Sequence, residues 1–395
     1  MSTIEKRNRY VMKILYPFPM KLSNGYTYML SILQFLNVLS LRLDVTLCSL
    51  DTDKEIDEYF TKVLGEKKNK EFKIKTLSNK FLGIKSNKFV FFYYLKQFIK
   101  SIESPVVIYS RDLKQMRLAI KDFRDSNNKY FIFETHQILS ENYQRKGDYK
   151  NSKILRKLES FVFKNSDLLI SITKTLKADI DEKFHVATKK HYVLPLGFNK
   201  RFLEIRPSKT PKYDLIYAGN FSSWKGLDIL IHAVKILKFE HNLKLKVMLI
   251  GASDDDIFTF GNLINLLDVS DCINIIKRIH HNEIYNYLKS SRIGVIPNKF
   301  EGDGMLYTNP LKLFEYMGAG LKIVASKLPS IQSSVSNDVV FFAKPEHPQD
   351  LAKTIIEALN SSRTNQIKQK KLAEKFTWES RAEKFLNILN ENFTN

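Results

Sequence analysis

The stretch from Tyr307 to Ser326 combines residue types whose spacing suits the binding of an anion. It reads as a loop that ends in Asn309-Pro310, a helix that carries Glu315, and a buried strand. Proline suits the first position of a helix, because its missing N–H would be unpaired there anyway. The unpaired N–H groups and the dipole of a helix start attract an anion such as a phosphate. We therefore predict an anion site followed by one fixed carboxylate; the alternative is an ordinary loop–helix–strand unit in which Glu315 is solvated.

The elements around this stretch indicate the architecture that would position it. The helix ends at Met317-Gly-Ala-Gly320, whose glycines can adopt positive φ, and Leu321 to Ala325 is typical of a parallel strand covered on both faces. The same alternation along the chain predicts an α/β protein with two doubly wound domains. Strands are predicted at 10–16, 44–49, 106–109, 129–134, 167–172, 213–218, 244–250, 272–277, 293–297, 321–325 and 339–342. Helices are predicted at 25–41, 174–183, 226–238, 348–360, 364–375 and 378–389, and a polar, proline-containing linker is predicted at 199–212.

Length and composition agree with two globular domains. The chain has 395 residues, which is more than a single hydrophobic core usually accommodates. Its 44% hydrophobic and 27% charged content excludes a disordered chain. The two cysteines, Cys48 and Cys272, lie in predicted strands and indicate neither a disulfide framework nor a metal cluster. The first ten residues lack the apolar segment of a signal peptide, and no window is apolar enough for a membrane helix. We therefore expect a cytoplasmic protein.

Positive charge is concentrated in the first half of the chain. The net charge is +21, and residues 1–200 contain 37 Lys+Arg against 21 Asp+Glu, whereas the remainder contains 26 against 21. This asymmetry predicts an anionic partner: nucleic acid, an anionic membrane face or an acidic substrate. A compositional drift toward lysine is the alternative.

Lysines alternate with aromatic residues between positions 62 and 100, ending in the run Phe89 to Leu95. The pattern suits a helix that lies on a membrane surface, a surface that stacks nucleic-acid bases, or a core-facing helix with a solvated lysine face. No nucleic-acid-binding motif accompanies it. We therefore expect the anionic inner face of a membrane, and no nucleic acid, as a partner.

Two polar side chains come shortly after predicted strands in the first half of the chain. Arg111 follows the strand at 106–109, and His136 follows the strand at 129–134. In open α/β sheets ligands bind beyond the carboxyl ends of strands. Both side chains are therefore candidates for binding or catalysis, although a lone residue of either type at such a position is more often structural. Gly25 follows the first strand without a Gly-x-Gly-x-x-Gly fingerprint, which is typical of a tight turn.

Three clusters have residue types that could bind a metal, and we interpret all three as non-metal. Asp51-Thr-Asp53 lies among acidic residues, as in a solvated loop. Asp254-Asp-Asp256 suits the start of a helix. His280-His281 adjoins Glu283, but no further ligand spacing supports zinc.

Several motifs occur in an order that is more specific than any one of them. Tyr213-Asp-Leu-Ile-Tyr-Ala-Gly-Asn-Phe-Ser-Ser-Trp-Lys-Gly226 precedes an apolar helix, and the stretch from Tyr307 to Ser326 contains a Glu-Tyr-Met helix. Together with Tyr192 to Phe202 and Leu168 to Lys177, they resemble the GT-B glycosyltransferases of family 4. The resemblance covers most of the chain, is strongest between about residues 190 and 326, and is weak between 50 and 100.

The resemblance implies a GT-B fold, in which two Rossmann-like domains face a cleft, and a retaining transfer of a sugar from a nucleotide-sugar donor. Lys225 would neutralise the diphosphate of the leaving nucleotide, Glu315 would bind its ribose, and His136 would face the donor sugar. The implied catalytic residues are His136, Lys225 and Glu301. The implied donor-binding residues are Gly219, Asn220, Lys225, Gly226, Ile279, Tyr307, Thr308, Asn309, Pro310, Leu311 and Glu315. The implied acceptor-binding residues are Gly25 and Arg111.

The sequence departs from the family pattern at two positions. Asn220 stands where an arginine is common, and Tyr307 stands where a first glutamate is usual. Asn220 removes one charge from the diphosphate site, and Tyr307 cannot act as a carboxylate toward the sugar. Glu301 would reach the sugar if the intervening loop folds back.

These observations lead to one expectation and its alternatives. Residues 1–198 are expected to bind the acceptor and 199–376 the donor, while 377–395 form a helix that crosses back to the first domain. The expected enzyme is a metal-independent, hexosyltransferase-type glycosyltransferase of surface polysaccharide biosynthesis, peripheral on the inner face of the membrane. It would use a UDP- or GDP-sugar as co-substrate, no cofactor, and a glycan or lipid-linked acceptor. The alternatives are another GT-B activity, such as epimerisation or hydrolysis, and a sugar-nucleotide-binding or scaffold subunit with impaired catalysis.

Overall fold

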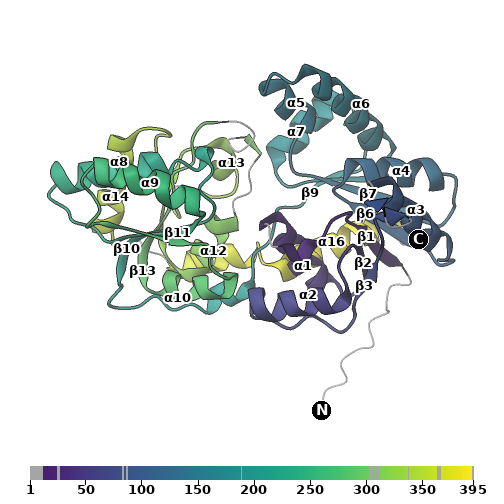
Figure 1. Cartoon of the computed structure of the whole chain (residues 1–395), viewed down its shortest axis with the longest axis horizontal. Helices are drawn as coiled ribbons and strands as arrows, with labels where there is room; N and C mark the ends of the chain where they lie inside the picture. Colours follow the sequence, from purple (N-terminus) through teal and green to yellow (C-terminus); the bar gives the residue numbers. More distant parts are fainter. Residues whose placement is uncertain are drawn as a thin grey trace, which may run out of the picture. The chain divides into compact units, whose positions relative to one another are not determined.

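The chain divides into two compact units. The computed structural model describes residues 12–393 except 25–26, 82–83, 86–87, 188, 302–305, 308–310, 337 and 363–365. Unit 1 comprises Met1–Leu194 and Ala382–Asn395, and unit 2 comprises Pro195–Arg381. Each unit contains a parallel sheet with helices packed against it (Figure 1). The prediction of two doubly wound α/β domains is confirmed.

Unit 1 is built on a seven-stranded parallel sheet in the order β3-β2-β1-β6-β7-β8-β9. Its strands are β1 (Lys13–Pro17), β2 (Asp44–Ser49), β3 (Phe72–Thr76), β6 (Val106–Ser110), β7 (Lys129–Thr135), β8 (Leu168–Ser171) and β9 (His191–Val193). A separate antiparallel hairpin pairs β4 (Lys80–Phe81) with β5 (Ile84–Lys85). The central strands β1 and β6 are almost wholly buried, which explains why they read as apolar runs in the sequence.

Helices from both ends of the chain pack on the sheet of unit 1. They are η1 (Leu22–Asn24), α1 (Thr27–Leu39), α2 (Asp53–Tyr59), η2 (Phe60–Leu64), α3 (Lys88–Lys100), α4 (Leu113–Phe123), α5 (Leu139–Arg145), α6 (Tyr149–Asn165), α7 (Lys174–Phe184) and α16 (Trp378–Phe393). The ring of Tyr109 in β6 lies 6.3 Å from that of Phe35 in α1 and 5.0 Å from that of Phe385 in α16. The C-terminal helix therefore contributes to the core of unit 1, although its first residues, up to Arg381, belong to unit 2.

Helix α3 has one face in the core and one face exposed. Phe91, Leu95 and Ile99 are fully buried, whereas Phe89 is 65% exposed and Tyr93 is 54% exposed. The lysine- and aromatic-rich segment thus combines a core-facing helix with two exposed aromatic rings one turn apart. Within the part of the chain that the structure describes, no helix has the length and apolar character needed to cross a bilayer.

Unit 2 is built on a six-stranded parallel sheet in the order β12-β11-β10-β13-β14-β15. Its strands are β10 (Tyr213–Ala218), β11 (Val247–Ala252), β12 (Ile273–Lys277), β13 (Ser291–Ile296), β14 (Lys322–Ser326) and β15 (Phe341–Ala343). The strand order reverses between β10 and β13, and ligands of such sheets bind beyond the carboxyl ends of the strands at this point. A ligand-binding site is therefore expected at the loops that follow β10 and β13.

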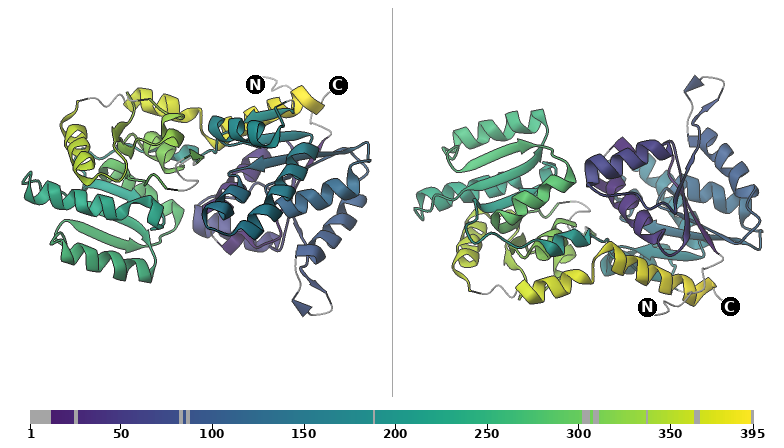
Figure 2. Two further views of the ribbon diagram at one scale, coloured as in Figure 1. Left: turned by 90° about the horizontal axis from the view of Figure 1, so that it is seen from above. Right: turned by 90° about the horizontal axis from the view of Figure 1, so that it is seen from below.

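The sheet of unit 2 has helices on both faces (Figure 2), with a hydrophobic core beneath each layer. The helices are η3 (Lys200–Glu204), η4 (Ser223–Lys225), α8 (Leu227–Phe239), α9 (Asp254–Leu266), η5 (His281–Glu283), α10 (Ile284–Lys289), α12 (Leu311–Ala319), α13 (Pro329–Gln332), α14 (Pro348–Asn360) and α15 (Gln366–Glu374). Helices α8, α9 and α14 cover one face, and α10, α12, α13 and α15 cover the other.

The segment from 199 to 212 differs from its prediction as a polar linker. Phe202 is fully buried in the core beside α12, and Ile205 is 7% exposed. Just before this segment, Phe198 forms a β-bridge with Thr377. The prolines and lysines make the segment appear polar in the sequence, whereas Phe202 and Ile205 pack in the core of unit 2.

Candidate functional site

The loop between β10 and α8 brings one lysine to the switch point of the unit 2 sheet. Gly226, directly before α8, has a φ of +67°, and a Cβ there would lie 2.0 Å from the carbonyl oxygen of Pro297 after β13. Only glycine permits this close approach of the two loops. The N–H of Lys299 also donates to the carbonyl of Trp224 at 2.9 Å. These contacts fix η4, and with it Lys225, beside the loop that follows β13.

The ammonium of Lys225 lies over an aromatic ring. Its Nζ is 3.4 Å from the ring centroid of Trp224. The residue is half-buried, and burial lowers the pKa of Lys225 from 10.5 to about 7. A nearby anion would favour the protonated form, so the lysine is suited to take up a proton when a phosphate binds.

Helix α12 presents Glu315 to the same end of the sheet. Oε1 of Glu315 lies 3.0 Å from Nε2 of His281 in η5, and both side chains are 13% exposed. The alternative of a solvated Glu315 is therefore wrong. Nδ1 of His281 is buried and has no hydrogen-bond partner among the described residues. The contact leaves Oε2 of Glu315 as the oxygen that could accept a ligand hydroxyl.

Lys312 lies one turn before Glu315 in α12 and is only 9% exposed. Its Nζ is 3.6 Å from the ring centroid of Tyr217 and has no hydrogen-bond partner among the described residues. Burial lowers the pKa of Lys312 well below its usual range, Lys225 lowers it further, and Glu315 raises it. A cation–π contact contributes only about 0.5–2 kcal/mol, and burying an unpaired ammonium costs several kcal/mol. The contact with Tyr217 therefore does not compensate for the burial of this lysine.

A second cluster of polar side chains, Arg111, His136 and Glu134, lies at the carboxyl ends of β6 and β7 in unit 1. An Arg111 guanidinium nitrogen lies 2.9 Å from Nδ1 of His136, and Nε2 of His136 lies 2.7 Å from Oε1 of Glu134. Because arginine only donates, Nδ1 must accept, and the imidazole proton lies on Nε2 and is donated to Glu134. The Tyr109 hydroxyl also donates to Glu134, whose side chain is 2% exposed. Both ring nitrogens of His136 are therefore engaged.

The remaining candidate residues are placed less favourably for chemistry. Asn220 is exposed, and its carbonyl accepts the Tyr217 hydroxyl at 2.6 Å. Ile279 is half-buried after β12, as is Leu311 at the start of α12. Tyr307 is 1% exposed, whereas Glu301 is exposed. Gly25, Thr308, Asn309 and Pro310 lie outside the described residues.

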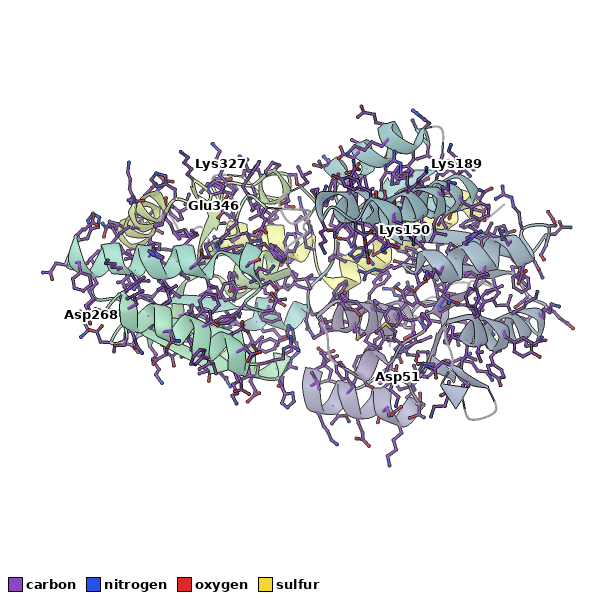
Figure 3. All side chains as sticks on the ribbon, turned by 45° about the horizontal axis from the view of Figure 1, so that its top comes forward. Asp51, Lys150, Lys189, Asp268, Lys327 and Glu346 are labelled. Atoms are coloured by element: carbon purple, nitrogen blue, oxygen red, sulfur yellow. The ribbon has the colours of Figure 1, made fainter. Side chains whose placement is uncertain are left out.

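The acidic clusters have local structural roles. Asp51, which is labelled in Figure 3, is fully buried. Its carboxylate accepts hydrogen bonds from the N–H groups of Leu22 and Ser23 and from the hydroxyls of Ser23 and Ser49. The interpretation as a solvated loop is therefore wrong for Asp51, whereas Thr52 and Asp53 are exposed. Asp256 completes a capping box with Ser253 at the start of α9, as the acidic cluster predicts. Among the described residues, no three His, Cys, Asp or Glu side chains are placed to hold a metal ion.

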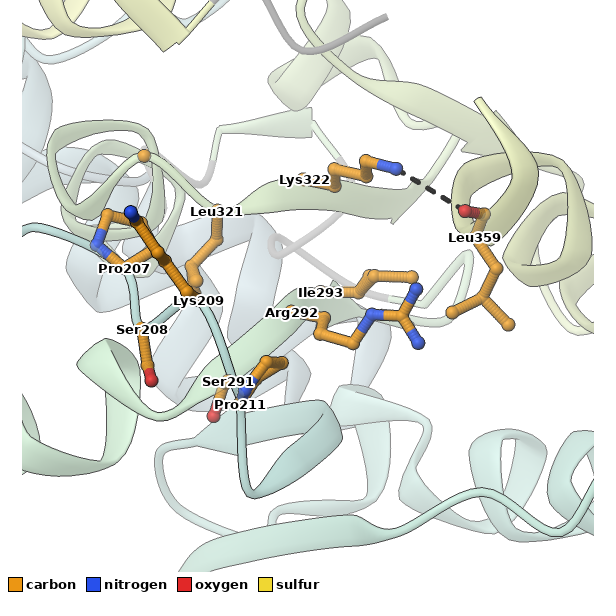
Figure 4. Close-up of a pocket in the computed structure, with 11 residues that line it drawn as sticks. Pro207, Ser208, Lys209, Pro211, Ser291, Arg292, Ile293, Leu321, Lys322 and Leu359 are labelled. Atoms are coloured by element: carbon orange, nitrogen blue, oxygen red, sulfur yellow. Dashed lines mark hydrogen bonds between the residues drawn. The ribbon is translucent and has the colours of Figure 1, made fainter. Parts of the chain in front are cut away.

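A cavity of about 230 Å³ lies elsewhere in unit 2 (Figure 4). Its lining includes Ser291 and Lys322, the first residues of β13 and β14, so it lies at the amino ends of the strands. Nζ of Lys322 donates to the carbonyls of Ala358 and Ser361 at 2.8 and 2.6 Å, and thereby caps the end of α14. The cavity is at the edge of the sheet opposite to Lys225.

Sequence reasoning missed three residues that the structure brings into the two groups: Lys312, His281 and Glu134. The spacing of Lys312 and Glu315 at i and i+3 is a signal that both lie on one face of a helix. Glu134 is a charged residue within an apolar strand, which is also a signal. No signal in the sequence pairs His281 with Glu315, because the two belong to separate elements.

The chain matches known proteins in sequence over part of its length. Residues 199–376 match the family model of glycosyl transferases group 1. An uncharacterized glycosyltransferase of Methanocaldococcus jannaschii is 26% identical over 236 residues, which are 58% of this chain and 61% of that protein. The MMP alpha-(1->4)-mannosyltransferase of Mycolicibacterium hassiacum is 24% identical over 218 residues, which are 54% of this chain and 51% of that protein. The matches thus span between about half and three fifths of these relatives.

Solved structures resemble nearly the whole chain. Sucrose-phosphate synthase from Thermosynechococcus elongatus superposes with a TM-score of 0.73 at 16% identity, covering 97% of this chain and 99% of that one. HepE of Anabaena, solved with UDP and glucose, gives a TM-score of 0.72 at 16% identity, covering 96% and 100%. Likeness at this level of identity shows the fold, and the prediction of a GT-B fold is confirmed. The chain thus has the GT-B fold, and its residues 199–376 match the family model of glycosyl transferases group 1.

Proposed function

We propose that this chain is a retaining, metal-independent glycosyltransferase that moves a sugar from a UDP- or GDP-sugar to a glycan or lipid-linked acceptor. The observation that supports it most is that η4 holds Lys225 beside the loop after β13, while α12 presents Glu315 at the same end of the sheet, within residues that match the glycosyl transferases group 1 model. Lys225 and Glu315 both act electrostatically on Lys312. HepE, which shares the fold, has been solved with UDP-glucose. One relative is a mannosyltransferase. The reaction we infer belongs to the synthesis of surface polysaccharide or glycoconjugate.

The proposed chemistry follows from where charge develops. When the glycosidic bond of the donor breaks, the leaving nucleotide diphosphate gains negative charge, and a fixed cation that meets this charge lowers the barrier. Lys225 is in position to do so without a metal ion. Oε2 of Glu315 would accept hydrogen bonds from the ribose hydroxyls of the nucleotide. Unit 2 would thus bind the donor mainly through its phosphates and ribose, with no separate cofactor.

Unit 1 would contribute the acceptor side of the reaction. The Arg111–His136–Glu134 group holds an imidazole in one orientation at the carboxyl ends of β6 and β7. The guanidinium of Arg111 has further N–H donors besides the one directed at His136, and these suit a sugar hydroxyl or an acceptor phosphate. We therefore propose His136 as the residue of unit 1 that meets the sugars, with Arg111 toward the acceptor.

An anionic membrane surface is the partner that we propose for unit 1, which would place the chain at the cytoplasmic face of a membrane. Phe89 and Tyr93 project from α3, and exposed aromatic rings beside lysines are typical of surfaces that insert shallowly into a lipid interface. Each lysine near an anionic leaflet contributes about 1 kcal/mol to binding. The basic first half of the chain supports the same docking.

Sugar turnover with a panel of UDP- and GDP-sugars tests the proposal. We expect Lys225→Met to lower kcat and Glu315→Gln to raise KM for the donor, because the first meets developing charge and the second meets the ribose. A Phe258→Ser variant in the exposed part of α9 is the matched control and should retain wild-type rates. Wild-type rates in both site variants would refute the assignment.

The same measurements separate the alternatives. A scaffold or binding subunit, which Asn220 and Tyr307 favour, would bind the donor but show no turnover over a broad acceptor panel. An epimerase or hydrolase would convert the donor in the absence of any acceptor.

A further inference from the structure

The buried lysine of α12 has no assigned role. We propose that Lys312 is a second ligand-binding cation, which holds the diphosphate of the donor together with Lys225. The inference rests on the nucleotide-sugar binding proposed above and adds to it the residue that completes the anion site. Three observations within unit 2 support it.

The first observation is that the ammonium of Lys312 donates no hydrogen bond to any residue that the structure describes. Its side chain is nine-tenths buried, and its Nζ has no hydrogen-bond partner within the described residues. The ring of Tyr217, 3.6 Å away, attracts the positive charge but accepts no conventional hydrogen bond. An ammonium has three donors, so this lysine can still donate to a ligand.

The second observation is that the backbone makes room for this ammonium. A Cβ on Gly219 would lie 2.7 Å from Nζ of Lys312, so any other residue at this position would displace the ammonium. Gly219 follows β10 directly, at the carboxyl end of the strand beside the switch point. The ammonium therefore reaches the edge of the sheet at which a ligand is expected.

The third observation is the charge of the immediate surroundings. Lys225 and Glu315 both act electrostatically on Lys312. Glu315 is itself in contact with His281, at 3.0 Å. Lys312 thus has a second lysine and one carboxylate in its electrostatic surroundings, and protonation of both lysines leaves positive charge for a ligand to neutralise. A diphosphate, with charge on both of its phosphates, fits two neighbouring ammonium groups better than a single phosphate does.

Calorimetric titration with inorganic pyrophosphate and with UDP and GDP tests the inference. Lys312→Met is compared with the wild type and with Lys322→Met, which removes the same group from a lysine whose donors are satisfied by backbone carbonyls. We expect Lys312→Met to weaken pyrophosphate and nucleoside diphosphate binding roughly 10- to 100-fold, as the loss of a charged hydrogen bond does. Lys322→Met should leave these affinities unchanged.

Thermal unfolding without ligand gives an independent readout. Because Lys312→Met removes a buried amine that has no hydrogen-bond partner among the described residues, its melting temperature should equal or exceed that of the wild type, whereas Lys322→Met should melt lower. A lower melting temperature of Lys312→Met, or its failure to fold, would mean that the lysine serves the fold and would overturn the inference. Lys312→Gln, of similar length, is interpreted by the same criteria.

The outcomes distinguish this inference from the proposed function. Unchanged pyrophosphate and nucleotide affinities in Lys312→Met would overturn the inference and leave the proposed function intact. Pyrophosphate binding that depends on Lys312, in a wild type that neither binds nor turns over any nucleotide sugar, would support the two-lysine site and overturn the proposed function. A wild type that binds none of these ligands would overturn both.

Discussion

Replacing Lys225 by methionine should flatten the pH dependence of the stability of unit 2. The unfolded chain holds a proton on Lys225 up to about pH 10.5, whereas the folded chain gives it up above about pH 7 because the ammonium is buried. Between these values the unfolded state binds more protons, so raising the pH stabilises the folded state. Methionine carries no proton in either state and removes this dependence.

The expected magnitude follows from the two pKa values. With about 7 in the folded state and 10.5 in the unfolded state, Lys225 destabilises the fold by about 4 kcal/mol at pH 7 and by about 1.4 kcal/mol at pH 9.5. The wild type should therefore gain up to about 3 kcal/mol between these pH values from this residue. The variant should lack this gain and be more stable than the wild type at pH 7. Lys312 adds a dependence of the same sign, which is weaker in the variant because Lys225 no longer lowers the pKa of Lys312.

Urea unfolding followed by tryptophan fluorescence provides the measurement. Both tryptophans of the chain, Trp224 and Trp378, lie in unit 2, so the signal reports this unit. The control is Lys244→Met, because Asp271 raises the pKa of the exposed Lys244 and keeps it protonated in both states up to pH 9.5. Equal changes in unfolding free energy between pH 7 and 9.5 for the wild type and Lys225→Met would refute the buried-ammonium reasoning.

Two further predictions concern unit 1. Glu134→Gln should lower kcat about 10- to 100-fold, because His136 loses a charged hydrogen bond that orients it. The KM for the donor should stay unchanged, and a loss confined to KM would contradict a positioning role. The double variant Phe89→Ser/Tyr93→Ser should bind anionic vesicles at least about tenfold more weakly, since two exposed aromatic rings no longer insert. Flotation of Phe258→Ser, an exposed ring of unit 2, should match the wild type, and equal flotation of all three proteins would exclude docking through α3.

The strands and the main helices could be predicted from the sequence because their burial is recorded in local patterns. Strands covered on both faces read as apolar runs, so β2 and β10 were predicted with their observed bounds. Helix α14 was also predicted in full, since a proline begins it and apolar residues recur along it. The linker prediction failed where two apolar residues, Phe202 and Ile205, outweigh the surrounding polar ones.

The candidate site could be predicted only in part. Lys225 and Glu315 were found because they belong to motifs, each within one stretch of chain. The environment that gives each its properties comes from other elements: Trp224 lies under the first and His281 contacts the second. The burial of Asp51 escapes prediction for the same reason, since the backbone N–H groups that donate to its carboxylate belong to η1, far away in the sequence.

Lys312 shows why such a residue escapes a reading of spacing alone. A lysine in the first turn of a helix is ordinarily solvated, and nothing adjacent to it in the sequence indicates otherwise. Its burial depends on Tyr217 and Gly219, which belong to β10 and the loop behind it. The absence of a side chain at Gly219 leaves space for the ammonium of Lys312. The next residue, Asn220, carries no positive charge, so the cation of this region comes from Lys312. In the anion site that we propose, the positive charge thus lies on the helix and not on the loop, and burial would make this lysine respond to a bound phosphate more strongly than a solvated lysine does.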